Sequence, residues 1–302
     1  MLSTRTPRPN LLSRGVSTAE NSGKIRFLRR RGWVASLAIL TATLALILSG
    51  CVTAKPALES GTPYIGKSWG AAGGEPFRFA LIGDKTGATP GDWPLFDQAL
   101  QEINAWKPDF AVMIGDMIQG DSVDAGRIQE QWGEFNSHIR ALEVPLFVIP
   151  GNHDISNPFM LEWWRATLGR TYYSFTYRDC LFIMLNTMEY WKDFAAYLGD
   201  EQIRYALDAI RKHPNVRHTF VFLHVPHWLD DTNAEWPILE QALASRPHTV
   251  FAGHIHRNTY EERNGGQYLV VTATKGDKPL VSPPKAPELG VFPAWAQISV
   301  EG

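Results

Sequence analysis

Cysteine is scarce in this sequence, with Cys51 and Cys180 the only two among 302 residues. Two cysteines cannot form the disulfide network that holds small secreted scaffolds together. An excess of basic residues is absent as well, because 29 lysines and arginines stand against 31 aspartates and glutamates. Eight of the basic residues and one acid lie in residues 1–50, so the remaining 21 basic and 30 acidic residues give the body a net charge of −9. We therefore expect no nucleic-acid partner, since binding to phosphates needs clustered positive charge.

The composition also excludes a disordered or fibrous protein. The chain is 44% hydrophobic and 20% charged, which is typical of a folded domain with a substantial core. Short apolar runs alternate with amphipathic stretches from residue 77 onward, and this alternation predicts an α/β domain with at least one mixed sheet. Strands are predicted at 77–82, 110–114, 145–149, 172–177, 180–185, 219–223, 249–251, 268–272 and 296–300, and helices at 94–106, 124–142, 158–168, 200–213 and 234–245.

The N-terminal segment has the pattern of an export signal. A basic cluster at 24–31 is followed by an apolar run at 33–48 and then by small residues before Cys51. The sequence Leu-Ser-Gly-Cys at 48–51 resembles the bacterial lipobox, and the resemblance implies that Cys51 is lipidated and becomes the mature N-terminus. The alternative is an uncleaved anchor at 33–50, which is near the short limit for spanning a bilayer.

Both alternatives place the body outside the cytoplasm, because the basic end of such a segment stays inside. Two acyl chains on Cys51 would suffice for stable membrane attachment, and Val52 after it favours the outer membrane in a cell that has one. We expect a bacterial lipoprotein of the cell envelope. Residues 1–50 are predicted to be its signal peptide, 51–75 a lipidated tether rich in small residues and proline, and 76–302 the folded domain.

The ends of the predicted strands carry residue types that bind metal ions. The strands are followed by Asp84, by Asp116, by Asn-His-Asp at 152–154, by His224 and by His-Ile-His at 254–256. Ligands of α/β sheets gather beyond the carboxyl ends of the strands, so these endings are expected to meet in one site. Carboxylate oxygens, an amide oxygen and imidazole nitrogens suit Mn, Fe, Zn or Co.

In this order, the strand endings resemble the pattern of the calcineurin-like metallophosphoesterase superfamily, from about residue 78 to residue 273. The family pattern consists of Asp-x-His, Gly-Asp, Gly-Asn-His-Asp/Glu, a lone His and Gly-His-x-His. The resemblance implies that residues 76–302 form an α/β sandwich of two mixed β-sheets flanked by helices. It also implies two divalent or trivalent metal ions as cofactors.

A role follows from the resemblance for each matching residue. Asp116 would bridge the two metal ions. The other ligands would be divided between the ions, with Asp84 and His256 in the first site, and Asn152, His224 and His254 in the second. His153 matches a residue that is not itself a ligand in the family, and it would protonate the leaving group or steady the phosphoryl oxygens.

The chain departs from the family pattern in two respects. The His of Asp-x-His is replaced by Thr86, and because a neutral hydroxyl is a poor ligand for these metals, the first site is expected to be weakened. The family's protein phosphatases have an Asp and an Arg where this chain has Gln119 and Gly120. The missing Asp removes a side chain that orients the catalytic His, and the missing Arg disfavours a serine/threonine protein phosphatase.

Lys85 is a candidate substrate-binding residue, as a point charge facing phosphate, or else a solvated side chain.

Together these features predict a metal-dependent phosphoesterase that hydrolyses a phosphomonoester or phosphodiester with a metal-bound hydroxide. A small phosphate-ester substrate is expected, because an acidic body slows the approach of large polyanions. The competing interpretation is a metal-poor pseudoenzyme that acts as an envelope binding protein, and Thr86 motivates it. His153 favours catalysis, since a purely structural metal would not need an uncoordinated histidine beside it.

Overall fold

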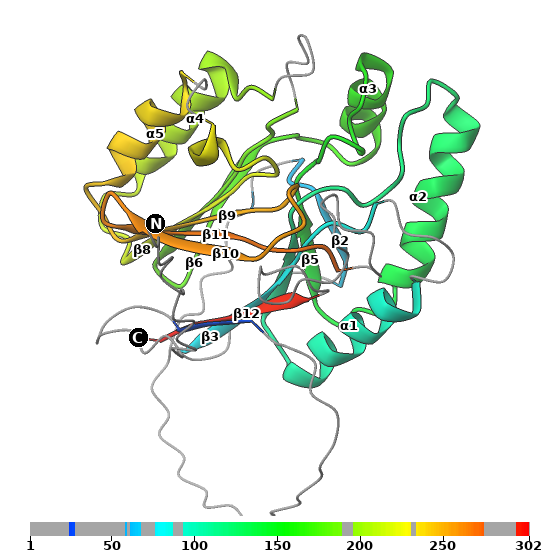
Figure 1. The fold of residues 1–302 in the computed structure, drawn as a ribbon, viewed down its shortest axis with the longest axis horizontal. Coiled ribbons are helices and arrows are strands. Elements are labelled where there is room, and N and C mark those ends of the chain that lie inside the picture. Colours follow the sequence, from blue (N-terminus) through cyan, green and yellow to red (C-terminus); the bar gives the residue numbers. More distant parts are fainter. Residues whose placement is uncertain are drawn as a thin grey trace, which may run out of the picture.

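A computed structural model describes residues 24–27, 58, 61–67, 76–86, 93–188, 196–230, 234–274 and 294–301, the first of these ranges by its backbone alone. This part of the chain forms two six-stranded sheets flanked by helices (Figure 1). The first sheet has the strand order β1-β12-β3-β4-β5-β2. Its strands are β1 (Lys24–Phe27), β2 (Tyr64–Gly66), β3 (Phe77–Ile82), β4 (Phe110–Met113), β5 (Pro145–Val148) and β12 (Trp295–Val300).

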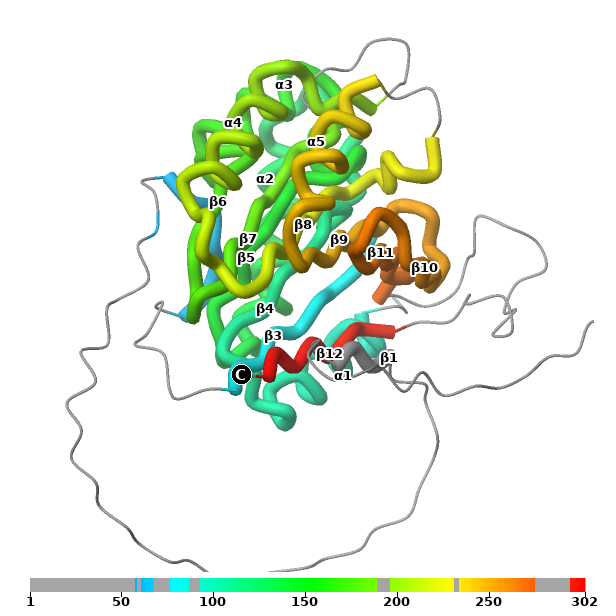
Figure 2. The backbone as a smooth tube through the Cα atoms, turned by 90° about the vertical axis from the view of Figure 1, so that its left-hand side faces the viewer, coloured from blue at the N-terminus to red at the C-terminus, as the bar shows by residue number. Residues whose placement is uncertain are grey.

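The second sheet has the strand order β10-β11-β9-β8-β7-β6. Its strands are β6 (Tyr173–Tyr177), β7 (Cys180–Met184), β8 (His218–Phe222), β9 (His248–Ala252), β10 (Thr259–Arg263) and β11 (Gly266–Val270). Each sheet has parallel strands in its centre and antiparallel strands at its edges. In Figure 2, β12 lies beside β3, although the two strands lie near opposite ends of the predicted domain in the sequence. Both sheets are therefore mixed, which confirms the predicted fold class.

Helices cover the outer face of each sheet, so the domain has four layers (Figure 1). Helices α1 (Trp93–Trp106), α2 (Ala125–Ile139) and α3 (Pro158–Thr167) share a buried apolar cluster with the first sheet. Helices α4 (Gly199–Lys212) and α5 (Trp236–Leu243) share another cluster with the second sheet. Each helix buries one apolar stripe, as the spacing of Ile128, Trp132, Phe135 and Ile139 in α2 illustrates.

Phenylalanine rings fill the space between the two sheets. Strand β3 turns Phe77, Phe79 and Leu81 into this space, while Ala80 and Ile82 face the helices. This alternation follows from the two-residue period of a β-strand. Phe79 stacks on Phe110 of the neighbouring strand with ring centroids 5.3 Å apart. Because each fully buried ring contributes roughly 2 kcal/mol to stability, the rings fix the two sheets face to face and so align their carboxyl ends.

Most predicted elements coincide with observed ones to within a few residues, but three strands, β1, β2 and β10, are not predicted. Strand β10 pairs with β11 across Asn264 and Gly265, which both have positive φ values of 50° and 77°. The Asn-Gly pair is a common sequence for a tight hairpin turn. Strand β2 lies within residues 51–75, the segment predicted as a tether, and pairs antiparallel with β5. Residues 64–66 of that segment therefore belong to the sheet, because main-chain pairing holds them there.

The N-terminal predictions fall mostly outside the described residues. The apolar run at 33–48 and Cys51 are among the residues that the structure does not describe. Strand β1, within the predicted signal peptide, pairs antiparallel with β12. Among the residues that are described, no helix combines the length and the apolar content that crossing a membrane would require.

Candidate metal centre and active site

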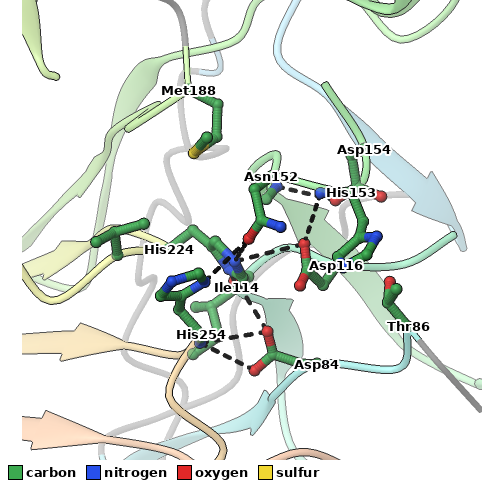
Figure 3. A network of polar contacts seen from close by, with 12 residues as sticks. Asp84, Thr86, Ile114, Asp116, Asn152, His153, Asp154, Met188, His224 and His254 are labelled. Atoms are coloured by element: carbon green, nitrogen blue, oxygen red, sulfur yellow. Dashed lines mark hydrogen bonds and ion pairs between the residues drawn. The ribbon is translucent and has the colours of Figure 1, made fainter. Parts of the chain in front are cut away.

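All six predicted ligands lie at carboxyl ends of central strands, three from each sheet. Side chains from the two sheets point toward one another and form one polar cluster (Figure 3). The positions are Asp84 after β3, Asp116 after β4, Asn152 after β5, His224 after β8, and His254 and His256 after β9. The structure thus brings together the residues that the strand endings predict.

One half of the cluster consists of Asp84, Asp116 and His256. One potential ligand atom from each of these side chains lies within 4.8 Å of the others, a spacing at which a single metal ion can contact all three. Asp84 is completely buried and Asp116 almost so. These are the residues expected at the first metal site.

The other half of the cluster converges on Asn152. Its Oδ1 atom lies 3.0 Å from His224 Nε2 and 2.9 Å from His254 Nδ1. His224 Nε2 is also 3.4 Å from Asp116 Oδ1. Asp116 is therefore near both halves, as expected for a residue that bridges two ions, and its assignment as a bridge stays a prediction.

The orientation of His224 is set by the main chain of β4's end. Its Nδ1 atom lies 2.8 Å from the carbonyl oxygen of Ile114, to which it donates a hydrogen bond. The remaining ring nitrogen, Nε2, then faces Asn152 and Asp116. A histidine held in this way by a carbonyl group presents a defined nitrogen to a metal ion.

Burial and mutual repulsion make the charges of this cluster costly without a cation. Burial raises the pKa of Asp84 to about 7, and the negative charge of Asp116 adds to this effect. Burial also raises the pKa of Asp116, but the positive charge of His224 and its hydrogen bond outweigh this and give a net lowering. Burial lowers the pKa of His224, whereas the charge of Asp116 raises it by more, to about 10. A divalent cation would take the place of the proton on His224 and relieve the repulsion between the carboxylates of Asp84 and Asp116.

The donor set fits the metals expected from the sequence. Two buried carboxylates, one amide oxygen and three imidazoles converge from opposite sheets, and such mixed oxygen and nitrogen donors suit borderline transition metals. Main-chain strain at the same place supports a functional role, because Asp116, His254 and His256 all have positive φ values, of 57°, 68° and 50°.

Two glycines allow the loops of the first sheet to approach the cluster. Gly115 has a φ of 92°, and a Cβ atom there would lie 2.6 Å from His224 Nδ1 and 2.7 Å from the nitrogen of Gly151. A Cβ atom on Gly151 would collide with the carboxylate of Asp116. A larger residue at Gly151 would displace the predicted bridging carboxylate, and one at Gly115 would push against His224 and the main chain of Gly151.

His153 lies beside the ligands and is held by two hydrogen bonds. Its main-chain amide donates to Asp116 Oδ1 at 3.0 Å, and its Nδ1 atom donates to the carbonyl oxygen of Gln119 at 2.8 Å. The sequence suggested that the ring would lack an orienting group, because position 119 has no aspartate. The structure shows that the ring does have one. The main-chain oxygen of Gln119 takes that place.

The two residues after Asp84 make contacts of their own. Thr86 is buried, and its hydroxyl group donates to the carbonyl oxygen of Ile118. Lys85 is also buried, which excludes the solvated alternative, and its Nζ atom lies 3.4 Å from the centre of the Trp93 ring. The role of Lys85 in substrate binding stays a prediction, as does the weakening of the first site by Thr86.

Asp154 and Gln131 brace the site from outside the ligand set. The carboxylate of Asp154 accepts hydrogen bonds from the amides of Met117, Ile118 and Gly151, which ties the loops after β4 and β5 together. Gln131 of α2 binds the main chain of Gly120. No pattern in the sequence points to Gln131, because a glutamine in an amphipathic helix resembles any surface residue.

Known proteins are similar to this chain in sequence over the region that contains the site. A family model described as calcineurin-like phosphoesterase matches residues 77–258, a range that contains every predicted ligand and His153. The serine/threonine-protein phosphatase CPPED1 of Homo sapiens is 29% identical over 213 residues, which are 60% of this chain and 64% of that protein. The 3',5'-cyclic adenosine monophosphate phosphodiesterase CpdA of Haemophilus influenzae is 29% identical over 195 residues, 59% of this chain and 66% of that protein. The matched region spans just under two thirds of the length of these relatives.

Solved structures are similar in fold. PhoD superposes with a TM-score of 0.57 at 11% identity, covering 76% of this chain and 65% of that one. The purple acid phosphatase PPD1 from yellow lupin (Lupinus luteus) seeds gives a TM-score of 0.52 at 16% identity, covering 74% of this chain and 49% of that one. These similarities confirm the predicted sandwich of two mixed sheets.

Proposed function

Because this chain belongs to the calcineurin-like phosphoesterase family, we propose that it is a metal-dependent phosphoesterase that hydrolyses a small phosphate ester. The observation that carries the proposal is the position of Asp116 between two groups of donors. Its carboxylate lies within 4.8 Å of ligand atoms of Asp84 and His256, and 3.4 Å from His224 Nε2. A buried carboxylate shared in this way suits a pair of metal ions.

The residues of the cluster have distinct tasks in the proposed reaction. Asp84, Asp116 and His256 would hold one ion, and Asn152, His224 and His254 would join Asp116 at the other. When bound, such ions supply a nucleophile at neutral pH by lowering the pKa of water, and they offset the charge of the phosphoryl group. His153 keeps Nδ1 engaged with Gln119, so its Nε2 atom is available to give a proton to the leaving oxygen.

The class of ester is proposed only as far as the relatives agree. One relative is named as a protein phosphatase and the other as a cyclic nucleotide phosphodiesterase, so hydrolysis of a phosphate ester is common to both names. Gly120 offers no side chain at the position where an arginine would bind a phosphomonoester dianion. A small substrate, either monoester or diester, is in keeping with the acidic body.

For location, we propose a lipoprotein of the cell envelope, anchored through Cys51. The support is the sequence alone: the basic cluster, the apolar run and the Leu-Ser-Gly-Cys ending at 48–51. The test is to express the full chain in a bacterial host and partition it into detergent. Wild-type protein should enter the detergent phase with the mass of an acylated chain, and Cys51→Ser should not. Equal partitioning of the two proteins, without added mass, would favour an uncleaved anchor.

Metal-dependent turnover is the direct test of the proposed activity. The full chain would be stripped of metal and reloaded separately with Mn, Zn, Fe or Co, and hydrolysis of an aryl phosphate would be compared with that of a bis-aryl phosphate. His153→Ala should lower turnover about 100-fold or more, because a general acid contributes factors of this order. His213→Ala, at the end of α4, is the matched control and should leave turnover unchanged. Folded protein without turnover on any metal would favour the pseudoenzyme.

A further inference from the structure

The loop between Asp116 and Gly120 determines where the ring of His153 points. The carbonyl oxygen of Gln119, at the end of this loop, lies 2.8 Å from His153 Nδ1. A carbonyl oxygen can only accept a hydrogen bond, so Nδ1 carries the hydrogen and Nε2 is the nitrogen that exchanges a proton with a substrate. A shift of this carbonyl group would rotate or release the ring. The orientation of the His153 ring therefore depends on the group that holds the peptide between Gln119 and Gly120.

Gln131 holds that peptide. Its Oε1 atom accepts a hydrogen bond from the amide of Gly120 at 2.7 Å, and its Nε2 atom lies 3.5 Å from the carbonyl oxygen of the same residue. Gln131 lies on α2 (Ala125–Ile139), whose neighbouring residues Ile128 and Trp132 are buried in the apolar cluster of the first sheet. The side chain thus connects the loop to a rigid helix.

Gly120 fits closely between Gln131 and His153. Its φ is +69°, and a Cβ atom on it would collide with the carbonyl oxygen of His153. The main chain of Gly120 therefore packs directly against the main chain of His153 while its amide is bound by Gln131. Through these contacts, a displacement of the Gly120 peptide would be transmitted to His153 in two ways, through the Gln119 carbonyl and through direct packing.

We propose that Gln131 is a positioning residue for His153, which it keeps aligned as the proton donor to the leaving group. The inference rests on the proposed phosphoesterase function. In the reaction, a water oxygen forms a bond to phosphorus and releases a proton to solvent, while the bond from phosphorus to the leaving oxygen breaks. The leaving oxygen takes a proton from His153 Nε2, and solvent then returns a proton to that nitrogen. Gln131 touches none of the reacting atoms.

The nature of the leaving group separates positioning from a purely structural role. A nitrophenolate leaves readily without a proton, whereas a phenolate or an alkoxide needs one. Misplacement of His153 should therefore slow the ester with the poor leaving group far more than the ester with the good one. A loss of overall stability or of metal would slow both esters equally. Substrate binding should change little in either case.

The variants are Gln131→Met, which removes both hydrogen bonds at similar length, and Gln131→Glu, which keeps the acceptor for the Gly120 amide. Gln129→Met, on the exposed face of the same helix, is the matched control. For phenyl phosphate, Gln131→Met should lower kcat about 10-fold with KM within twofold, since small misplacements cost factors of 10 to 100. For 4-nitrophenyl phosphate the loss should stay below about threefold. Gln131→Glu should retain most of the activity, and Gln129→Met all of it.

A double variant and a spectroscopic measurement complete the test. Gln131→Met should cause no further loss in a His153→Ala background, because both changes affect the same proton transfer. In the ¹⁵N spectrum of histidine-labelled full chain, the His153 Nδ1–H signal, assigned with His153→Ala, should shift in Gln131→Met and stay in place in Gln129→Met.

Equal losses for the two esters, additive effects in the double variant, or an unmoved His153 signal would each overturn the inference. A wild-type protein that hydrolyses neither these monoesters nor the corresponding bis-aryl phosphates would refute the proposed function instead. In that case the His153 signal alone decides whether Gln131 holds the ring.

Discussion

The hydroxyl group of Thr86 donates a hydrogen bond to the carbonyl oxygen of Ile118, 2.5 Å away. The amides of Lys85 and Thr86 also donate to the carbonyl oxygen of Asp116, each at 2.8 Å. The chain that follows Asp84 is thus fastened to the loop after β4 at three points. The position at which the family pattern has a metal-binding histidine serves here to hold the loop that carries Asp116 and Gln119.

Thr86→Val tests this role because valine has the same shape but no hydroxyl. The variant leaves the buried carbonyl group of Ile118 without its partner, which should lower the free energy of unfolding by about 1–2 kcal/mol. Thr86→Ser keeps the hydroxyl and should lose less. Urea unfolding of the metal-free proteins measures the difference. Calorimetric titration with Mn²⁺ should give Thr86→Val an affinity close to the wild type, whereas a tenfold weaker affinity would identify Thr86 as a ligand.

Asp154 should contribute strongly to the stability of the folded protein. Its carboxylate accepts hydrogen bonds from three buried amides, two in the loop after β4 and one in the loop after β5. Asp154→Ala leaves all three amides unpaired, and the free energy of unfolding should fall by about 3 kcal/mol or more. The exposed Asp208→Ala is the control and should change it far less, because the ion pair of Asp208 with Arg211 is open to solvent. A similar small change in Asp154→Ala would mean that water replaces the carboxylate.

The site could be predicted from the sequence to the extent that strand ends carry distinctive side chains. Aspartate, asparagine and histidine directly after apolar runs mark Asp84, Asp116, Asn152, His224 and His254, and parallel strands bring their ends to one edge. Alternation of large apolar residues likewise predicts which face of a strand is buried. These signals are local, so they need no knowledge of the final packing.

The remaining features depend on main-chain groups, which are the same in every residue. The carbonyl oxygen of Gln119 orients His153. Every residue has such an oxygen, so the side chain at position 119 does not predict this contact. Strand β2 is held by pairing with β5, although it has only three residues and only Ile65, between the exposed Tyr64 and Gly66, packs against the core. Gln131 finds its partner only when α2 packs on the first sheet. Such contacts follow from tertiary structure and leave no pattern in the sequence.

The close approach at Gly151 leads to a prediction with an internal control. A Cβ atom there would collide with the carboxylate of Asp116, so Gly151→Ala should displace that carboxylate and weaken Mn²⁺ binding at least tenfold. Gly133 is exposed on α2, and no atom lies within 4 Å of a Cβ atom added to it. Gly133→Ala should therefore stabilise the protein by about 0.5–1 kcal/mol and leave metal binding unchanged. Calorimetric titration and thermal unfolding of both variants test the two statements, and an unchanged Mn²⁺ affinity in Gly151→Ala would contradict the first.

Stability should fall in acid partly because of His218, far from the metal centre at the start of β8. Burial lowers the pKa of His218 to about 4, and the positive charges of His248 and Arg217 contribute to the shift. Its Nε2 atom is engaged with the hydroxyl of Thr249 at 2.9 Å. The unfolded chain takes up the proton near pH 6.5, but the folded protein does so only near pH 4. Stability from this residue is thus complete above pH 6.5 and is lost as the pH falls toward 4.

His218→Gln removes this proton uptake and keeps a side chain that can bind Thr249. Between pH 7 and pH 5, the metal-free wild type should lose about 2 kcal/mol more of its free energy of unfolding than the variant, since the unfolded state binds the extra proton over this range. Between pH 7 and pH 8 both proteins should show the same slope, because His218 is neutral in the folded and the unfolded chain. Urea unfolding at each pH gives the comparison. Parallel losses down to pH 5 would show that His218 takes up its proton equally well in the folded protein.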